Sequence, residues 1–459
     1  MQQIRLDSKD GLANGWAGAG VSDARNLPER ARAKSAPAAN VHEAADEQTT
    51  KRSWVSATFR FARNAMAGLL LLTAVPVAIV GWRSQHLRYY DHTFSDQRIE
   101  LVERLRPLMA AKDASITPMQ AGLAFHALQG TPKSDEFPMV ASSPSAEWPW
   151  RTHKPSADMF KSTGAPMRLF NGPSPEHIIE RVSAGFSANE LAYLREIAEA
   201  PVWKDFDLVA SANAVDIIGG QYQLPFKESA FLPAMPSWRF AGTKELAYAS
   251  TSRAAYYLAI GQPAKAETVL RSTISFGFAM IDNASSTMDG LIGAVVANIG
   301  RGGLAQLYDA THVTNALVAD VPMPTRQSSD PLRFGQKLSV AELQQRYLLE
   351  AGDPALPRAV RMEQLSQASY SSCRSIPGMI FGPNAATRTA FDNASKTLAR
   401  FPSEQALLDL MLEATNRVPD KEIINVAPER FVMGAALIAS KITNNPRFST
   451  CTRLAISYW

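Results

Sequence analysis

The chain has 459 residues, of which 46% are hydrophobic, and its formal net charge at pH 7 is only +4. Its length is enough for one large domain or two ordinary ones with real hydrophobic cores. Acidic and basic residues are interspersed, so the chain lacks the basic stripe that nucleic-acid binding requires, and no nucleic-acid partner is expected.

Residues 1–50 are rich in alanine, glycine, serine and charged residues and nearly lack large apolar side chains. Such a composition cannot build a core, so we expect a disordered cytoplasmic tail. Residues 51–63 are predicted to begin a helix at the membrane interface, with Arg60 and Arg63 near the lipid headgroups.

An uncharged run of eighteen residues follows from Ala65 to Trp82. As a helix it would extend about 27 Å, close to the thickness of a bilayer's hydrocarbon core. We therefore predict a single transmembrane helix at 64–82. A buried core helix or a cleaved signal peptide fits less well, because more than sixty residues precede the run and it has no polar face. The apolar side chains of the predicted anchor are Leu69, Leu70, Leu71, Leu72, Val75, Val77, Ile79 and Val80.

The orientation of this predicted anchor follows from the cations beside it, since lysine and arginine are retained on the cytoplasmic side. The fifteen residues before the run contain four cations, and the fifteen after it contain two: Lys51, Arg52, Arg60 and Arg63, against Arg83 and Arg88. The sequence thus predicts a single-pass protein of a cell inner membrane with a cytoplasmic N-terminus and a periplasmic or otherwise extracytoplasmic C-terminal domain.

Helical patterns dominate the exported part of the chain. Residues 83–129 are predicted to form a helical stalk, with helices at 91–112 and 117–129, and 176–459 an exported helical domain. In that domain, Ser187 and Glu190 have the spacing of a capping box. Further helices are predicted at 187–200, 244–260, 264–281, 288–308, 339–351, 355–370, 385–400, 403–417 and 428–443. Because alternating strand patterns are nearly absent, we expect a mainly α fold of stacked, repeat-like helix pairs.

Residues 130–175 are rich in proline and serine and are predicted to form a long loop. Trp148 and Trp150 lie in it beside Pro149. Exposed tryptophans on a proline-restricted loop favour binding to another protein. The alternative is that the loop wraps over its own domain.

A short pattern, YxLxxGxPA, occurs at 256–264 and again at 347–355. Each copy predicts a helix end with a left-handed glycine, followed by a proline in the first turn of the next helix. The first copy resembles a tetratricopeptide repeat, because Tyr257, Gly261, Ala266 and Leu270 fall at that motif's spacing. It departs from the motif at Ser250, Arg253, Ala254 and Phe278, and the second copy has Pro357 at the small-residue position. The resemblance implies a solenoid-like fold whose surface binds proteins.

The two cysteines, Cys373 and Cys451, both lie in the part predicted to be exported. In an oxidising compartment they can form a disulfide, which would close a long loop and stabilise the fold by roughly 4–5 kcal/mol. Two buried thiols are the alternative interpretation. Their spacing matches neither a metal motif nor a redox pair.

No compact catalytic or cofactor motif is present: CxxCH, Walker A, HExxH and GxSxG are all missing. No cofactor or metal is therefore predicted, and catalytic residues cannot be named. Pairs such as His177 with Glu180 and Asp309 with His312 share helical faces, but a metal site needs three or four ligands. The glycines at 300–303 predict a helix break or, less readily, a site where backbone amides contact an anion. The remaining histidines of the exported part are scattered: His86, His92, His126 and His153.

Two functions remain open on this basis. The first, which we favour, is a membrane-anchored accessory or scaffold subunit whose exported helical domain binds partner proteins in an electron-transport, photosynthetic, secretion or envelope complex. The second is a membrane-tethered, hydrolase-like envelope enzyme whose site is assembled only in three dimensions. A polar cleft that joins histidines to carboxylates would favour the enzyme.

Overall fold

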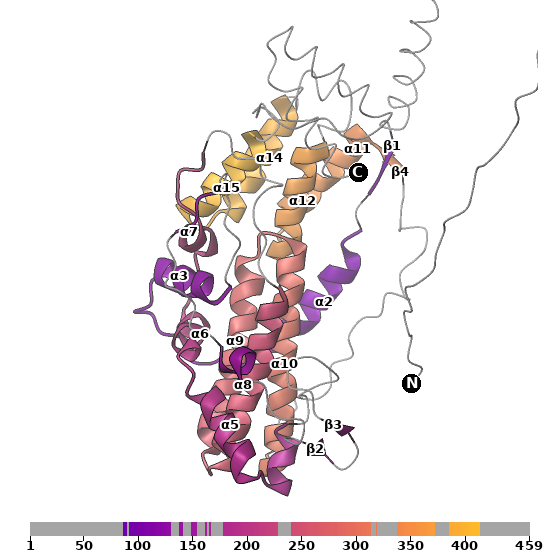
Figure 1. Ribbon diagram of the computed structural model, residues 1–459. Coiled ribbons are helices and arrows are strands. Elements are labelled where there is room, and N and C mark those ends of the chain that lie inside the picture. The colour runs from indigo at the N-terminus through magenta and orange to yellow at the C-terminus, as the bar shows by residue number, and fades with distance from the viewer. Residues whose placement is uncertain are drawn as a thin grey trace, which may run out of the picture. The chain divides into compact units, whose positions relative to one another are not determined.

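The computed structural model describes residues 86–89, 91–129, 137–140, 148–153, 161–162, 165–166, 178–227, 240–313, 318, 337–371 and 385–413. All of them belong to one compact unit, 71–459. This part of the chain is mainly helical, which confirms the mainly α part of the predicted fold class (Figure 1). None of its helices has the length and apolar content needed to cross a bilayer. The tail, the predicted anchor at 64–82, both cysteines and the predicted helix at 428–443 lie outside the described residues.

The helices predicted from 187 to 417 that the structure describes lie close to their expected positions, whereas α4, α6 and α7 were not predicted. The helices are α2 (Thr93–Glu103), η1 (Arg106–Leu108), α3 (Pro118–Gln129), α4 (Pro149–Thr152), η3 (Glu180–Ala184), α5 (Ala188–Ala198), α6 (Val202–Ser211), α7 (Ile217–Gln221), α8 (Phe240–Ala259), α9 (Pro263–Asn283), α10 (Thr287–Thr311), α11 (Val340–Gly352), α12 (Arg358–Ser371), α14 (Ala385–Leu398) and α15 (Pro402–Glu413). The short strands are β1 (His86–Arg88), β2 (Lys161–Ser162), β3 (Ala165–Pro166) and β4 (Lys337–Ser339). β1 pairs antiparallel with β4, and β2 with β3.

Helices α8, α9 and α10 form the centre of the larger core. Gly261 in the turn between α8 and α9 has a φ of +75°, and Pro263 stands in the first turn of α9, as the first YxLxxGxPA copy predicts. The second copy behaves differently. Gly352 is the last residue of α11 and has no positive φ, and α12 begins only at Arg358. Both copies join two helices, but only the first uses the predicted glycine and proline geometry.

Helix α10 is continuous through 300–303, so the predicted break there is wrong, and so is the alternative of amides presented to an anion. The physical reason is close packing: a Cβ on Gly300 would lie 2.8 Å from Ile274 Cγ1, and one on Gly303 2.5 Å from Leu270 Cδ2. Farther along the interface between α9 and α10, a Cβ on Gly277 of α9 would lie 2.6 Å from the amide nitrogen of Ala297. These glycines allow two long helices to approach each other.

This packing predicts opposite effects for two glycine substitutions in helix interiors. Gly277→Ala places a methyl group against the backbone of α10 and should lower the free energy of unfolding by about 2 kcal/mol. Gly302→Ala has nothing within 4 Å of the new Cβ and should raise it by about 0.5–1 kcal/mol through helix propensity. Urea unfolding of both variants measures the difference. A stabilised Gly277→Ala protein would contradict the close approach of α9 and α10.

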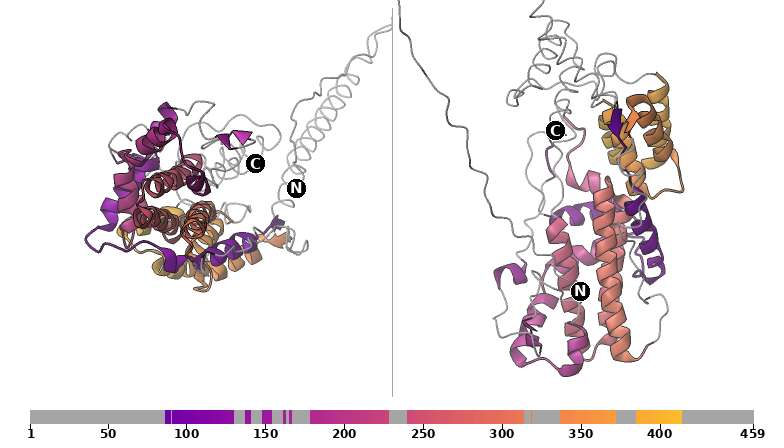
Figure 2. Two further views of the ribbon diagram at one scale, coloured as in Figure 1. Left: turned by 90° about the horizontal axis from the view of Figure 1, so that it is seen from below. Right: turned by 90° about the vertical axis from the view of Figure 1, so that its right-hand side faces the viewer.

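The predicted stalk is corrected by the burial of its helices. Ile99 of α2 and Phe125 of α3 are each 1% exposed and belong to the same hydrophobic core as the α8–α10 side chains. In Figure 2 the indigo α2 runs along the central helices. Residues 93–129 are therefore part of the domain, because α10 packs against α2, and α6 and α7 pack against α3.

A second group of helices, α11 to α15, has cores of its own. One is built mainly from α12, α14 and α15, with Phe137, Ile218 and Tyr222 added from earlier in the chain. The other joins Tyr89 to Leu343, Tyr347 and Ala368. This group meets the α8–α10 group where α12 contacts α9 and α10. Its helix α15 also contacts α7.

Candidate functional site

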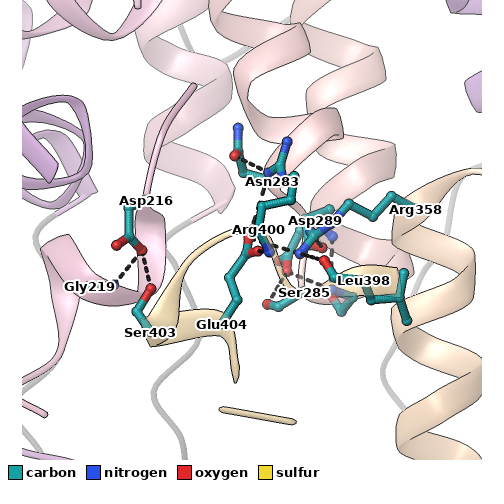
Figure 3. Close-up of polar contacts among 12 residues, drawn as sticks. Asp216, Gly219, Asn283, Ser285, Asp289, Arg358, Leu398, Arg400, Ser403 and Glu404 are labelled. Atoms are coloured by element: carbon teal, nitrogen blue, oxygen red, sulfur yellow. Dashed lines mark hydrogen bonds and ion pairs between the residues drawn. The ribbon is translucent and has the colours of Figure 1, made fainter. Parts of the chain in front are cut away.

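The boundary between the two helix groups carries a cluster of polar side chains, all buried or half-buried except Arg400, which we call the polar junction. It is drawn in Figure 3. Its members come from the N-terminus of α7, the ends of α9 and α10 that face each other, the start of α12, and the turn between α14 and α15. They are Asp216, Asn283, Asp289, Arg358, Arg400, Ser403 and Glu404.

Arg358 is the central cation of the junction. Its guanidinium donates to the carbonyl oxygens of Ala284 at 2.8 Å and Leu398 at 3.3 Å, and forms an ion pair with Glu404 at 2.8 Å. Glu404 is 3% exposed. Burial lowers the pKa of Arg358 to about 10, and the nearby Glu404 carboxylate offsets part of that effect. The side chain therefore ties the end of α9 to the ends of α14 and α15.

Two further contacts join the groups. Arg400 donates to the side-chain oxygen of Asn283, and its amide donates to Glu404 at 2.7 Å. Ser403 at the start of α15 donates its hydroxyl proton to Asp216. The same Asp216 oxygen caps α7 by accepting from the amide of Gly219 at 2.8 Å. The end of α9 is thus joined to the second group through the Ala284 carbonyl and the Asn283 side chain, and the start of α15 is joined to the cap of α7.

Asp289 is the junction's titratable group of greatest interest. It completes a capping box at the start of α10, because its carboxylate accepts from the Ser286 amide at 3.0 Å and from the Ser285 hydroxyl at 3.0 Å. The residue is only 6% exposed. Burial raises its pKa to about 6, although these hydrogen bonds act in the opposite direction. Tyr222 of the second core lies close enough to feel its charge, and burial raises the pKa of that phenol.

A smaller cluster is centred on Glu350 of α11. Tyr89 donates to Glu350 at 2.7 Å, His92 lies 3.3 Å away and Arg346 3.1 Å away. Burial alone raises the pKa of Glu350, but hydrogen bonds from His92, Tyr89 and Arg346 outweigh it, so the pKa is lowered. The Arg346 guanidinium also lies 3.9 Å from the centre of the Tyr89 ring. This cluster fastens the segment that follows the predicted anchor to the second helix group.

Trp148 and Trp150 are the clearest correction to the predicted site residues. They are 5% and 4% exposed and belong to the main core. Their ring centres are 5.4 Å apart, and the Trp150 ring lies 5.8 Å from that of Trp203 on α6. Pro149 begins the short helix α4, where its missing amide proton costs nothing. The rings fill the domain's interior, so they do not form an exposed partner-binding surface, and this part of 130–175 follows the alternative interpretation.

The described histidines do not converge. Buried His126 contacts the carbonyl oxygen of Val140 at 3.2 Å, and burial lowers its pKa. His153 lies 3.2 Å from Glu196, while His312 ends α10 with a left-handed φ of 56°. Among the residues that the structure describes, no group of three or more histidine, cysteine or acidic side chains is placed to hold a metal ion. His177 and the side chain of His86 lie outside the described residues.

The polar junction was not found from the sequence. Ser286 and Asp289 have capping-box spacing, and that signal was available. Nothing local marked Arg358 and Glu404, which stand 46 residues apart and meet only through packing of α12 against the α14–α15 turn. Chemically, the junction pairs its charges with one another and with helix ends, which is an arrangement for holding two groups together.

Comparison with known proteins adds no identification: no protein-family model, curated protein or solved structure matches the chain. The resemblance of 256–270 to a tetratricopeptide repeat accordingly stays a prediction.

Proposed function

We propose that this protein is a single-pass, membrane-anchored accessory or scaffold subunit, and that its helical domain binds partner proteins in a membrane complex on the extracytoplasmic side. The anchor is the apolar run at 64–82, and the cation count beside it gives the orientation. The described domain follows that run almost directly along the chain.

The observation that carries this proposal is how early the chain enters the domain after the apolar run. β1 begins at His86, four residues beyond Trp82, and Tyr89 is already 7% exposed in the core with Tyr347. Four residues span at most about 14 Å of extended chain. If 64–82 crosses a bilayer, the domain must lie against the membrane surface rather than on a long stalk. An anchored subunit that docks membrane partners needs such a position.

Helix pairs supply the partner-binding part of the proposal. α8 with α9 and α11 with α12 are antiparallel neighbours joined by short turns. Stacked helix pairs present extended surfaces that bind proteins in repeat architectures. Because a shared architecture does not by itself establish a shared function, the test has to detect the partner protein directly.

The test compares the full chain with a variant that lacks residues 64–82, both expressed in the native cell. We expect the full chain to stay in the membrane fraction after alkaline carbonate washing. Its exposed lysines, among them Lys204, Lys265 and Lys396, should then form chemical cross-links to one recurrent membrane protein, identified by mass spectrometry. The deletion variant should be released and should lose those cross-links.

Two results would contradict the proposal at separate points. Release of the full chain by carbonate would show that 64–82 is not an anchor. Membrane retention with cross-links only inside the chain would leave the anchor in place and remove the scaffold role. A circular dichroism spectrum of the purified deletion variant checks that the helical domain is intact, so that lost cross-links report position rather than unfolding.

A further inference from the structure

The elements β1, β4 and α11 form the end of the domain that the chain reaches first after the apolar run. β1 begins four residues beyond Trp82 and pairs antiparallel with β4, and α11 follows β4 directly. In Figure 1 these three elements lie together, and α5 lies at the opposite end of the described helices. Because four residues span at most about 14 Å, a bilayer crossed by 64–82 would meet this end of the domain first.

Leu349 is the exposed apolar side chain of α11. It is 68% exposed, the largest value among the large hydrophobic side chains that the structure describes. Leu343 and Tyr347 of the same helix are at most 1% exposed, so α11 turns these two side chains into the core and Leu349 outward. A single exposed leucine is common on protein surfaces, so its exposure alone identifies no partner.

The position of Leu349 supplies what its exposure does not. Arg346, three residues before it, places its guanidinium 3.9 Å from the centre of the Tyr89 ring, and the next residue, Glu350, accepts from the Tyr89 hydroxyl at 2.7 Å. Residues three apart in a helix are neighbours on its surface. Tyr89 is itself only seven residues beyond Trp82. Leu349 therefore stands beside the point where the chain enters the domain from the predicted anchor.

The charges of α11 indicate an apolar contact rather than an electrostatic one. The helix carries one arginine and two glutamates, so it has no excess of positive charge to attract anionic lipid. Glu342 is engaged at the start of the helix, where it accepts from the Ser339 amide at 2.9 Å and from the Ser339 hydroxyl at 2.7 Å. Leu349 gains free energy wherever its side chain leaves water, whatever the charge of the surface.

We propose that the Leu349 side chain inserts into the lipid of the bilayer that 64–82 crosses, where the acyl chains meet the headgroups, and so holds α11 against the membrane. The inference rests on the anchor of the proposed function. Lipid is the occupant because the short tether keeps this end of the domain beside the membrane surface. The tether also makes the contact intramolecular, so that one apolar side chain is enough to maintain it.

Photo-cross-linking of the full-length protein in phosphatidylcholine liposomes tests this inference. The photoreactive residue p-benzoylphenylalanine replaces Leu349 in one variant and Val313 in the matched control. Val313 is 50% exposed and follows the last turn of α10, whereas α12 stands against the first turn, at Gly290. After irradiation, mass spectrometry should find lipid adducts at position 349 in about tenfold higher yield than at 313, as burial of a leucine-sized side chain implies.

Carbonate washing of the same liposomes separates failure of this inference from failure of the anchor. A protein that stays in the membrane but gives equal or no lipid adducts at the two positions overturns the inference and leaves the anchor in place. Release by carbonate overturns both. In native membranes, an adduct between position 349 and a protein instead of lipid would also overturn the inference, because the surface would then belong to a partner protein. Circular dichroism confirms that both variants keep the helical fold.

Discussion

Replacing Trp150 by alanine is expected to lower the free energy of unfolding by about 3–5 kcal/mol, the usual cost of removing a large aromatic side chain from a packed core. The ring is 4% exposed and lies between those of Trp148 and Trp203. Its loss would leave a cavity beside Trp203 of α6. Urea unfolding, followed by tryptophan fluorescence and circular dichroism, measures the change.

Leu349→Ala provides the matched control, since that side chain is large, apolar and 68% exposed on α11. It should change the free energy of unfolding by no more than about 0.5 kcal/mol. If Trp150→Ala instead left stability unchanged and released a bound protein, the ring would be an interface residue after all. Unfolding of Trp150→Ala therefore distinguishes a core position from an interface position for this ring.

The second large effect is expected at the polar junction. Arg358→Met keeps most of the side-chain length but removes the charge beside buried Glu404. It should lower the free energy of unfolding by about 3–5 kcal/mol. The cost comes from the lost ion pair with buried Glu404, whose remaining ion pair, with Arg400, is longer at 3.6 Å, and from the lost contacts to Ala284 and Leu398. Thermal unfolding, compared with denaturant unfolding of the same variant, measures this loss in the free energy of unfolding.

The charge contribution is separated by a double substitution and by a surface pair. Arg358→Met with Glu404→Gln should cost less than the two single changes added together, because neither charge is then left alone. Lys396→Ala breaks an ion pair whose side chains are 68% and 55% exposed, and should cost no more than about 0.5 kcal/mol. Equal losses at Arg358 and Lys396 would show that the junction is not buried in solution.

Local signals were enough wherever the chemistry of an element lies within a few residues. The predicted helix at 117–129 is α3, Pro118–Gln129, and the capping box at Ser187 and Glu190 begins α5. The turn with Gly261 and Pro263 follows the same principle. In each case the deciding interaction joins residues no more than five positions apart, so a short sequence window contains both partners.

Local signals did not indicate which surface of an element another part of the chain would cover. The glycines at 300–303 have the composition of a break, yet they lie inside α10 because α9 supplies the Ile274 and Leu270 contacts. Trp150, beside a proline in a predicted loop, is typical of an exposed partner-binding residue, but Trp203 of α6 packs against it. Glycine and tryptophan each suit two environments, and the choice depends on a neighbour far away in the chain.

By itself, the sequence determined the mainly helical fold, the position of most helix ends, and an apolar run whose length matches a bilayer. Tertiary structure alone decided that α2 and α3 belong to the core, that Trp148 and Trp150 are interior, and that Arg358 meets Glu404. The reason is the range of the interactions. Helix ends are set by hydrogen bonds between near neighbours, whereas burial and pKa depend on elements brought together only when the chain folds.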